Sequence, residues 1–252
     1  MKRSIIMLTL FFISVSHSHA QRQMEYLDRG VVAVRNAEGH VFVSWRLLAT
    51  EPQETAFNLY RNIGNGKVEK LNKEVISKTT HFIDTKADST QSINYFVKTI
   101  TKGMEGAASK SFNLKPGNRP YFSIALQTPP GYSPNDGSVA DLDGDGEYEI
   151  VLHQVGRSHD NSQAGVTDPP IFQAYKLDGT LLWSINLGKN IREGAHYTQF
   201  MVYDLDGDGR AEVAMKTADG SMDARGNIIG DSTKDWRNDR GYILWTGIPD
   251  HL

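Results

Sequence analysis

Apolar and polar residues alternate with a period of two through the first half of the chain. Every second residue between 41 and 47 is apolar, and the same rhythm returns at 57–60 and 93–97. This alternation is typical of short strands that bury one face. It predicts a β-sandwich of the fibronectin type III or immunoglobulin-like kind, with Trp45 and Tyr95 in its core.

The second half carries short apolar runs that each follow an acidic stretch. Residues 149–152 and 212–215 are apolar after their first position and include β-branched side chains. We interpret both as buried strands rather than helix starts. Between them, 172–175 and 181–183 flank an Asp178-Gly179 turn, which predicts a hairpin. The 23 glycines and the short alternating runs together favour an all-β protein with many turns.

The two acidic stretches are copies of one motif, 63 residues apart, which we call the first acidic loop (residues 141–149) and the second acidic loop (residues 204–212). Each has acidic residues at positions 1, 3, 5 and 9, and glycine at position 6, where a sharp turn needs it. Carboxylates converging on one point repel one another without a cation, and hard oxygen ligands suit calcium better than zinc. We therefore predict two Ca²⁺ sites, the first built by Asp141, Asp143, Asp145 and Glu149 and the second by Asp204, Asp206, Asp208 and Glu212, with position 7 (Glu147, Arg210) giving a backbone carbonyl.

An EF-hand is the competing interpretation of these loops. Its loop of about 12 residues ends in a bidentate glutamate and runs into a helix. Here position 12 is Leu152 in one copy and Met215 in the other, and a strand pattern follows. An acidic surface turn without a cation is a further alternative, but two copies at one spacing argue against it.

The repeated order of loop, strand and hairpin is typical of a β-propeller blade. A propeller needs about four blades or more to close. Residues 120–252 have room for about two, so we expect an incomplete propeller. A proline- and glycine-containing linker at 115–120 separates it from the sandwich, which we place at 24–115.

The N-terminus has the features of a secretory signal peptide. Basic residues at positions 2 and 3 precede an 11-residue, mostly apolar run at 5–15, which is too short to span a bilayer. Ser18-His19-Ala20 supplies small residues for cleavage, so residues 1–20 are the expected signal peptide. We expect an exported protein, periplasmic or extracellular.

Composition limits the crosslinks and the binding partners that we expect. The chain has no cysteine, so an exported form has no disulfides and bound metal is the available crosslink. A net charge of −3 gives no reason to expect nucleic acid or an anionic membrane as partner.

Longer motifs resemble one family closely. These are residues 187–204, which lead into the second acidic loop, together with 160–165, 175–180 and 215–220. They resemble the rhamnogalacturonan lyases of polysaccharide lyase family 11, over essentially the whole chain after the signal peptide. The resemblance implies an N-terminal β-sandwich followed by an eight-bladed, calcium-rich propeller, of which this chain holds the first quarter. The missing C-terminal blades are then an expected partner.

The resemblance also implies a substrate and a reaction. The substrate is the pectic polysaccharide rhamnogalacturonan I, cleaved at C4 of galacturonate by β-elimination. A calcium ion or an arginine on the adjacent carboxylate assists by stabilising the developing enolate, and a basic side chain removes the C5 proton. Basic residues near the motifs make His196 and Lys216 candidate bases, and Asp160 and Asn161 candidate substrate contacts.

Three alternatives stay open at this stage. One is an unstable gene remnant, because an open sheet of two blades exposes strand edges and half a core. The catalytic base can lie in blades outside this chain, in which case the chain by itself has little or no activity. The chain can also be a calcium-dependent carbohydrate-binding or adhesion module without catalysis, because acidic loops of this kind also stabilise propellers that only bind.

Overall fold

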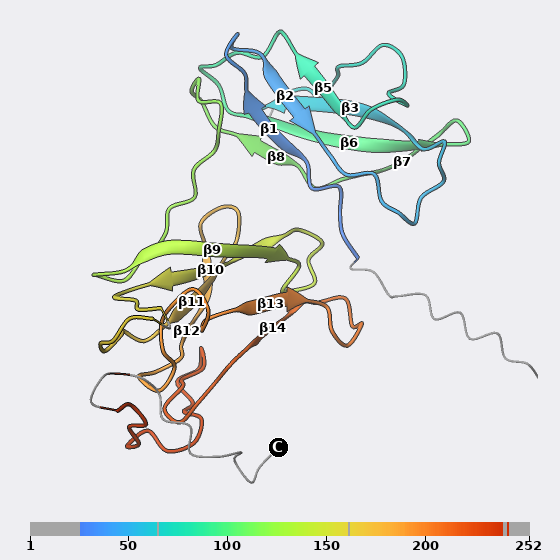
Figure 1. Cartoon of the computed structure of the whole chain (residues 1–252). Helices are drawn as coiled ribbons and strands as arrows, with labels where there is room; N and C mark the ends of the chain where they lie inside the picture. The colour runs from blue at the N-terminus through green and yellow to red at the C-terminus, as the bar shows by residue number, and fades with distance from the viewer. Residues whose placement is uncertain (1–25, 65, 161, 239–240, 242–252) are drawn as a thin grey trace, which may run out of the picture.

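The computed structural model describes residues 26–64, 66–160, 162–238 and 241. Within these ranges the chain is all-β and contains no helix, so no described helix could cross a membrane. The predicted signal peptide (residues 1–20) and the candidate contact Asn161 lie outside the described residues. Figure 1 shows two β units, one above the other.

The first unit is a β-sandwich of two antiparallel sheets. One has the strand order β1-β2-β5, and the other has β4-β3-β6-β7 with β8 also paired to β6. The strands are β1 (Val32–Arg35), β2 (Val41–Ser44), β3 (Ala56–Ile63), β4 (Glu69–Lys70), β5 (His81–Asp84), β6 (Ile93–Thr101), β7 (Met104–Ala108) and β8 (Phe112–Leu114).

The sandwich core follows from the alternation in the sequence. Val41, Val43 and Trp45 are buried against residues from the facing sheet, among them Tyr95, so the predicted core positions of Trp45 and Tyr95 are confirmed. The alternation also predicted a buried side chain at Leu47, but this residue is 52% exposed. Strand β2 has already ended at Ser44, and beyond a strand end the period of two no longer assigns a side chain to a face.

One charged cluster lies inside the sandwich. Arg61 Nη1 donates to Asp84 Oδ2 at 2.5 Å, and the Tyr95 hydroxyl donates to the same oxygen at 2.9 Å. The side chains of Arg61 and Asp84 are only 9% and 4% exposed. Burial, and after it the Asp84 carboxylate, raises the pKa of the Tyr95 hydroxyl. Hydrogen bonding therefore satisfies the buried charges, as an interior of low polarity requires.

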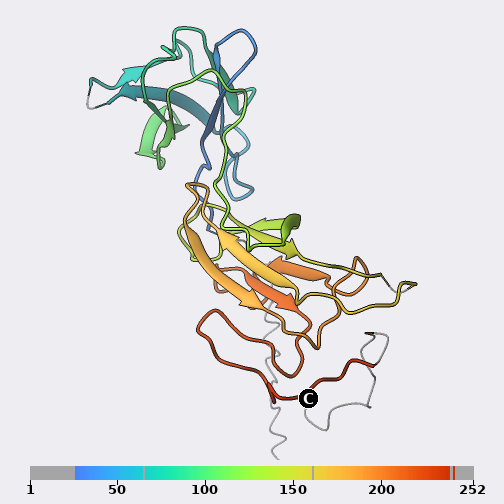
Figure 2. The same cartoon turned by 90° about the vertical axis from the view of Figure 1, so that its left-hand side faces the viewer.

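The second unit begins with a four-stranded antiparallel sheet, seen in yellow-green to orange in Figure 2. Its strands, β9 (Ser133–Ala140), β10 (Glu149–Val155), β11 (Ile171–Tyr175) and β12 (Leu181–Asn186), pair in the order β12-β11-β10-β9. This simple up-and-down order is that of a propeller blade. Strands β13 (Phe200–Tyr203) and β14 (Glu212–Met215) form a second, two-stranded sheet. The expected sandwich and incomplete propeller are confirmed.

The strands and the hairpin that the sequence predicts in this unit are present. The runs after the two acidic loops are β10 and β14, and the predicted hairpin is the pair β11–β12. Phe172 packs edge-on against Phe200 of β13, with ring centroids 4.9 Å apart. Val151, Ala174 and Leu187 complete the buried centre of this core. The two sheets therefore share one apolar core, which fixes the position of the second acidic loop between β13 and β14.

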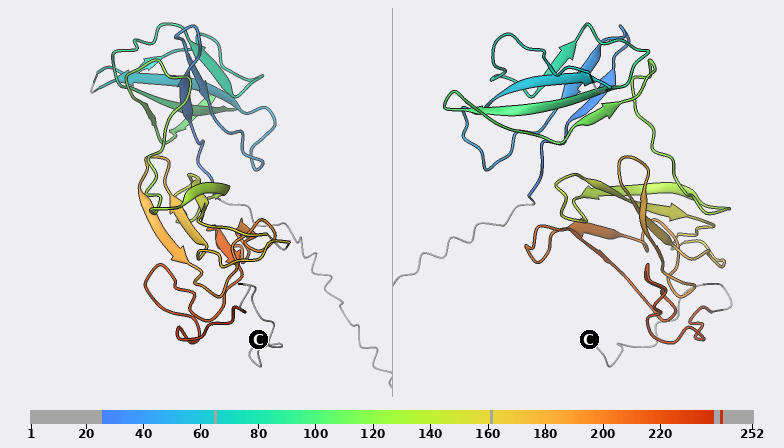
Figure 3. Two further views of the ribbon diagram at one scale, coloured as in Figure 1. Left: turned by 60° about the vertical axis from the view of Figure 1, so that its left-hand side comes forward. Right: turned by 180° about the vertical axis from the view of Figure 1, so that it is seen from behind.

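The sandwich meets the second unit beside the acidic loops. The Asp28 amide donates to the Gly146 carbonyl at 2.8 Å, and a Cβ on Gly209 would lie 2.9 Å from the Tyr26 ring. Arg46 stacks 4.3 Å above the ring of Tyr148. Residues 26–28 precede β1, whereas the linker that enters β9 follows β8, so two stretches of chain connect the units (Figure 3).

Candidate cation sites and the polar loop beside them

The first residue of each acidic loop winds the backbone around itself. The buried Asp141 carboxylate accepts the amides of Gly144 at 2.7 Å and Gly146 at 2.8 Å. These two glycines have φ values of 76° and 88°, which residues with a Cβ rarely adopt. In this way a short polar side chain and two glycines make the tight turn that the motif predicts.

Three carboxylates converge in the first acidic loop. Asp141, Asp143 and Glu149 each place one oxygen within 4.8 Å of the others. Glu149 is 1% exposed and accepts the Leu142 amide at 2.8 Å. Burial raises the pKa of Glu149. A buried carboxylate cluster with only oxygen donors fits a hard divalent cation, which would offset the cost of burial.

The second acidic loop repeats this geometry. Asp204 accepts the amides of Gly207 at 2.7 Å and Gly209 at 3.0 Å, and Glu212 accepts the Leu205 amide at 2.8 Å. The converging oxygens belong to Asp204, Asp206 and Glu212. Equivalent positions 1, 3 and 9 thus meet in both copies, and each cluster could hold a metal ion.

Side chains at positions 5 and 7 lie outside these clusters. Asp145 forms ion pairs with Lys110 at 3.2 Å and Lys176 at 2.9 Å, and Asp208 accepts the Arg210 amide at 2.9 Å. Burial raises the pKa of Glu147, which lies near Arg46 of the sandwich. The Arg210 side chain packs over Gly144 of the first loop. Their roles as ligands stay predictions.

The candidate residues Asp160 and His196 come together at the surface. His196 Nδ1 lies 2.7 and 2.8 Å from the two oxygens of Asp160. The imidazole is 63% exposed. Lys216 is exposed, and its ammonium lies 5.8 Å from the ring of Tyr197, the residue after His196. The two candidate bases therefore belong to one neighbourhood.

Buried polar residues that the sequence analysis missed hold this neighbourhood in place. Arg192 is 3% exposed and donates to the carbonyls of Gly165 at 3.0 Å and Gly241 at 2.8 Å. Glu193 Oε2 lies 2.9 Å from His153 Nε2. One signal pointed to this pair: His153 is the one titratable residue after Glu149 in the segment that forms β10.

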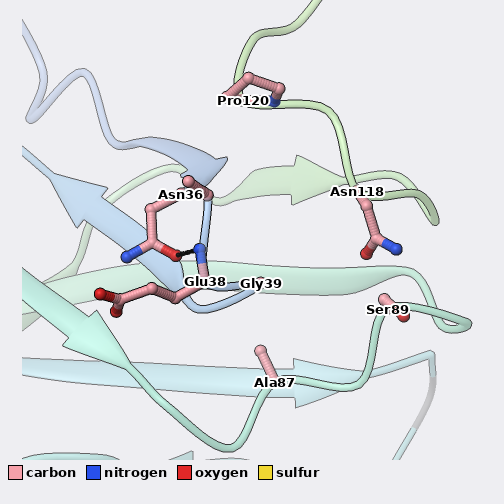
Figure 4. A pocket seen from close by; sticks show the side chains of 8 residues that line it. Asn36, Glu38, Gly39, Ala87, Ser89, Asn118 and Pro120 are labelled. Carbon is pink, nitrogen blue, oxygen red and sulfur yellow. Dashed lines mark hydrogen bonds between the residues drawn. The ribbon is translucent and has the colours of Figure 1, made fainter.

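The described residues also enclose a shallow hollow of about 450 Å³ in the sandwich (Figure 4). It lies between the turn after β1, the loop after β5 and the linker, and none of the predicted site residues lines it. The Asn36 side chain that borders it accepts the Glu38 amide of its own turn at 3.1 Å. Its lining residues are Asn36, Ala37, Glu38, Gly39, Ala87, Ser89, Asn118 and Pro120.

Together, the sandwich, the blade and the paired acidic loops define a class of β-propeller protein with an N-terminal β-sandwich and acidic clusters that could each hold a metal ion. Family comparison identifies the class more closely. Residues 22–114 match the rhamnogalacturonan I lyase beta-sheet domain, and residues 125–249 match the C-terminal domain of rhamnogalacturonan lyase family 11. The chain belongs to rhamnogalacturonan lyase family 11, as its motifs predicted.

Individual relatives agree with this assignment. The chain is 49% identical over 235 residues to the rhamnogalacturonan exolyase YesX and 49% identical over 236 residues to the rhamnogalacturonan endolyase YesW, both of Bacillus subtilis. These matches cover 89% of this chain but only 37% and 36% of the two relatives. The chain therefore spans little more than a third of their length.

Solved structures give the same result. A rhamnogalacturonan lyase of Bacillus licheniformis superimposes with a TM-score of 0.79 at 51% identity, covering 89% of this chain and 38% of the other. The crystal structure of the exotype lyase YesX also gives a TM-score of 0.79, at 48% identity.

Proposed function

We propose that this chain acts on rhamnogalacturonan I as part of an exported lyase. The similarity to YesX and YesW along 89% of the chain carries this proposal. The basic and apolar N-terminus supports export to the periplasm or the extracellular space. Rhamnogalacturonan I is then the polysaccharide partner.

The proposed reaction is β-elimination at galacturonate. A base takes the C5 proton, the electron pair of that C–H bond forms the C4=C5 double bond, and the C4–O bond breaks. The oxygen leaves with a proton, and the new chain end carries a 4,5-unsaturated uronate. The C5 proton is weakly acidic because the adjacent carboxylate repels the developing charge, so neutralising that carboxylate accelerates the step.

Two side chains of this chain have geometry suited to a sugar acid. Asp160 fixes the His196 imidazole through Nδ1, which leaves Nε2 available to a substrate oxygen or a proton. Lys216 adds an exposed positive charge near the same segment. We propose Asp160 and Asn161 as substrate contacts and keep His196 and Lys216 as candidate bases.

We propose Ca²⁺ as the cation of both acidic loops. Each cluster offers only carboxylate oxygens on a loop that can adjust its ligand distances, which suits calcium better than the strict octahedron of magnesium. The cation would neutralise buried charge and tie its loop to the following strand. We assign it this structural role rather than a catalytic one.

Binding and product formation test the proposal together. The chain is mixed with rhamnogalacturonan I and calcium, and the ultraviolet absorbance of the unsaturated uronate is followed beside YesX at equal concentration. We expect rhamnogalacturonan I to be bound in preference to homogalacturonan, with product formed far more slowly than by YesX. Equal binding of the two polysaccharides, or binding of neither, would contradict the proposal.

We keep a second function as an alternative, a calcium-dependent carbohydrate-binding or adhesion module without catalysis. It is supported by the two carboxylate clusters, each of which could hold a metal ion. Asp160→Asn and His196→Gln variants then weaken retention of the polysaccharide, and product stays absent at all concentrations. Measurable product from the unaltered chain would exclude this alternative.

A further inference from the structure

A lysine from outside the first acidic loop reaches the carboxylates of that loop. Lys176 Nζ lies 2.6 Å from Asp143, 2.9 Å from Asp145 and 3.8 Å from Glu149. Asp143 and Glu149 are two of the three residues that converge on the candidate cation position. The ammonium thus contacts the same carboxylates that a bound cation would use.

The fold fixes Lys176 at this position. It lies directly after β11, where its amide donates to the Thr180 carbonyl at 2.9 Å and its carbonyl accepts the Gly179 amide at 3.0 Å. These bonds close the turn between β11 and β12. A lysine with its ordinary pKa of about 10.4 is protonated at neutral pH. Lys176 therefore brings a charge of +1 to the first acidic loop.

The sandwich adds a second positive charge. Lys110 Nζ lies 3.2 Å from Asp145 and also donates to the backbone carbonyl of that residue. The Lys110 amide is itself held by Asp28 at 2.8 Å. Both lysines meet at position 5 of the first loop, where they pair with the Asp145 carboxylate.

The second acidic loop is surrounded by different side chains from the first. Asp206 accepts the Asp208 amide at 3.1 Å, and Asp208 accepts the Arg210 amide at 2.9 Å. Within the described ranges no lysine or arginine forms an ion pair with an acidic residue of this loop. Its own basic residue, Arg210, instead packs over Gly144 of the first loop.

We propose that Lys176 is a built-in counter-cation of the first acidic loop, which makes the two loops unequal. The second loop depends on an external divalent cation and binds it tightly. The first is already partly neutralised, and it binds calcium only as Lys176 gives up its carboxylates. This inference rests on the proposed cation sites and concerns this chain's own lysine rather than catalysis.

Removing this charge should strengthen the weaker site. A single charge at about 4 Å changes a binding constant by roughly tenfold when the surroundings are water-rich, and by more when they are not. Lys176 is 29% exposed, so the lower figure applies. The Lys176→Gln variant removes the charge and keeps a polar side chain with N–H donors, one atom shorter than lysine.

Calorimetric titration of the chelator-stripped full chain with CaCl2 tests the proposal. The unaltered chain should show two classes of site, the tighter one lost in Asp206→Asn and the weaker one in Asp143→Asn. Lys176→Gln should raise the affinity of the weaker class roughly tenfold. Lys67→Gln, which removes an exposed lysine of the sandwich, should leave both classes unchanged.

Thermal unfolding gives an independent measurement. In chelator, Lys176→Gln should unfold at a lower temperature than the unaltered chain, and saturating calcium should remove the difference. If Lys176→Gln leaves the weaker affinity unchanged, or if Asp143→Asn abolishes the tighter class, the counter-cation role is refuted while the cation sites stand. If the unaltered chain binds no calcium, the cation sites fail and this inference falls with them.

Discussion

Replacing Glu193 tests how the polar loop is held. Glu193 is 1% exposed, and its carboxylate lies 2.9 Å from His153 Nε2 and 3.1 Å from the Thr198 hydroxyl. His153 stacks on Phe172, with ring centroids 4.7 Å apart, so it has no room to turn toward another partner. The segment between Glu193 and Thr198 carries His196, which links this buried contact to the proposed substrate contacts.

The loss of stability follows from the buried groups that lose their partner when Glu193 is replaced. In Glu193→Ala the His153 nitrogen loses its partner, which costs about 1–3 kcal/mol for a buried polar group. Loss of a buried methylene adds about 0.8 kcal/mol. Thr198 is less affected because its hydroxyl also reaches the Gly194 carbonyl at 3.2 Å. We expect a destabilisation of about 2–4 kcal/mol for Glu193→Ala and about 1 kcal/mol for Glu193→Gln, which keeps an acceptor but not the charge.

Hydrogen exchange measured by mass spectrometry resolves the two units separately. A loss of about 3 kcal/mol corresponds to roughly a hundredfold faster exchange of protected amides. We expect this in peptides from β10 and β11, with peptides from β6 of the sandwich unchanged. The exposed Glu54→Ala serves as control and should change neither. If Glu193→Ala leaves β10 as protected as before, or if the glutamine variant is equally damaging, the argument from the carboxylate is wrong.

Three further predictions concern stability. Tyr95→Phe removes the hydrogen bond to buried Asp84 and should lower the unfolding free energy of the sandwich by about 1.5–3 kcal/mol in urea titration. Hydrogen bonds from Asn58 and Tyr60, and then Lys98, lower the pKa of Glu105 to about 2. Because this folded-state pKa is depressed, the stabilisation is complete above pH 4.5 and is lost as pH falls toward 2; Glu105→Gln should flatten that slope in thermal unfolding. Gly188→Ala places a Cβ 2.6 Å from the Gly220 carbonyl and should destabilise by more than about 1 kcal/mol, whereas Gly39→Ala, strained but with open space, should cost less in the same assay.

Much of the architecture was predictable because local patterns encode it. Alternation identified the strands that bury Val41, Val43 and Trp45, and the glycine at position 6 identified each loop. Spacing also predicted that the carboxylates at loop positions 1, 3, 5 and 9 converge, and in both loops those at positions 1, 3 and 9 do so. These features depend on residues close together in sequence, so a single sequence contains the information.

The rest depends on contacts between distant segments. Lys176 lies 27 residues beyond Glu149, and only the pairing of β10 with β11 brings the two together. The approach of Lys110 to Asp145 needs the sandwich to lie against the second unit. The buried pair of His153 and Glu193 likewise joins residues 40 apart. No local pattern specifies such pairs, because each is set by how separate elements pack.

The contact between residues 26–28 and the acidic loops has a mechanical consequence. The sandwich is attached to the second unit both before its first strand and after its last, at Asp28 and through the linker into β9. A body held at one point can swivel in every direction, whereas one held at two can turn only about the line that joins them. The glycines at position 6 of the acidic loops leave room for the contact with residues 26–28. These turn residues therefore also limit how the sandwich rotates.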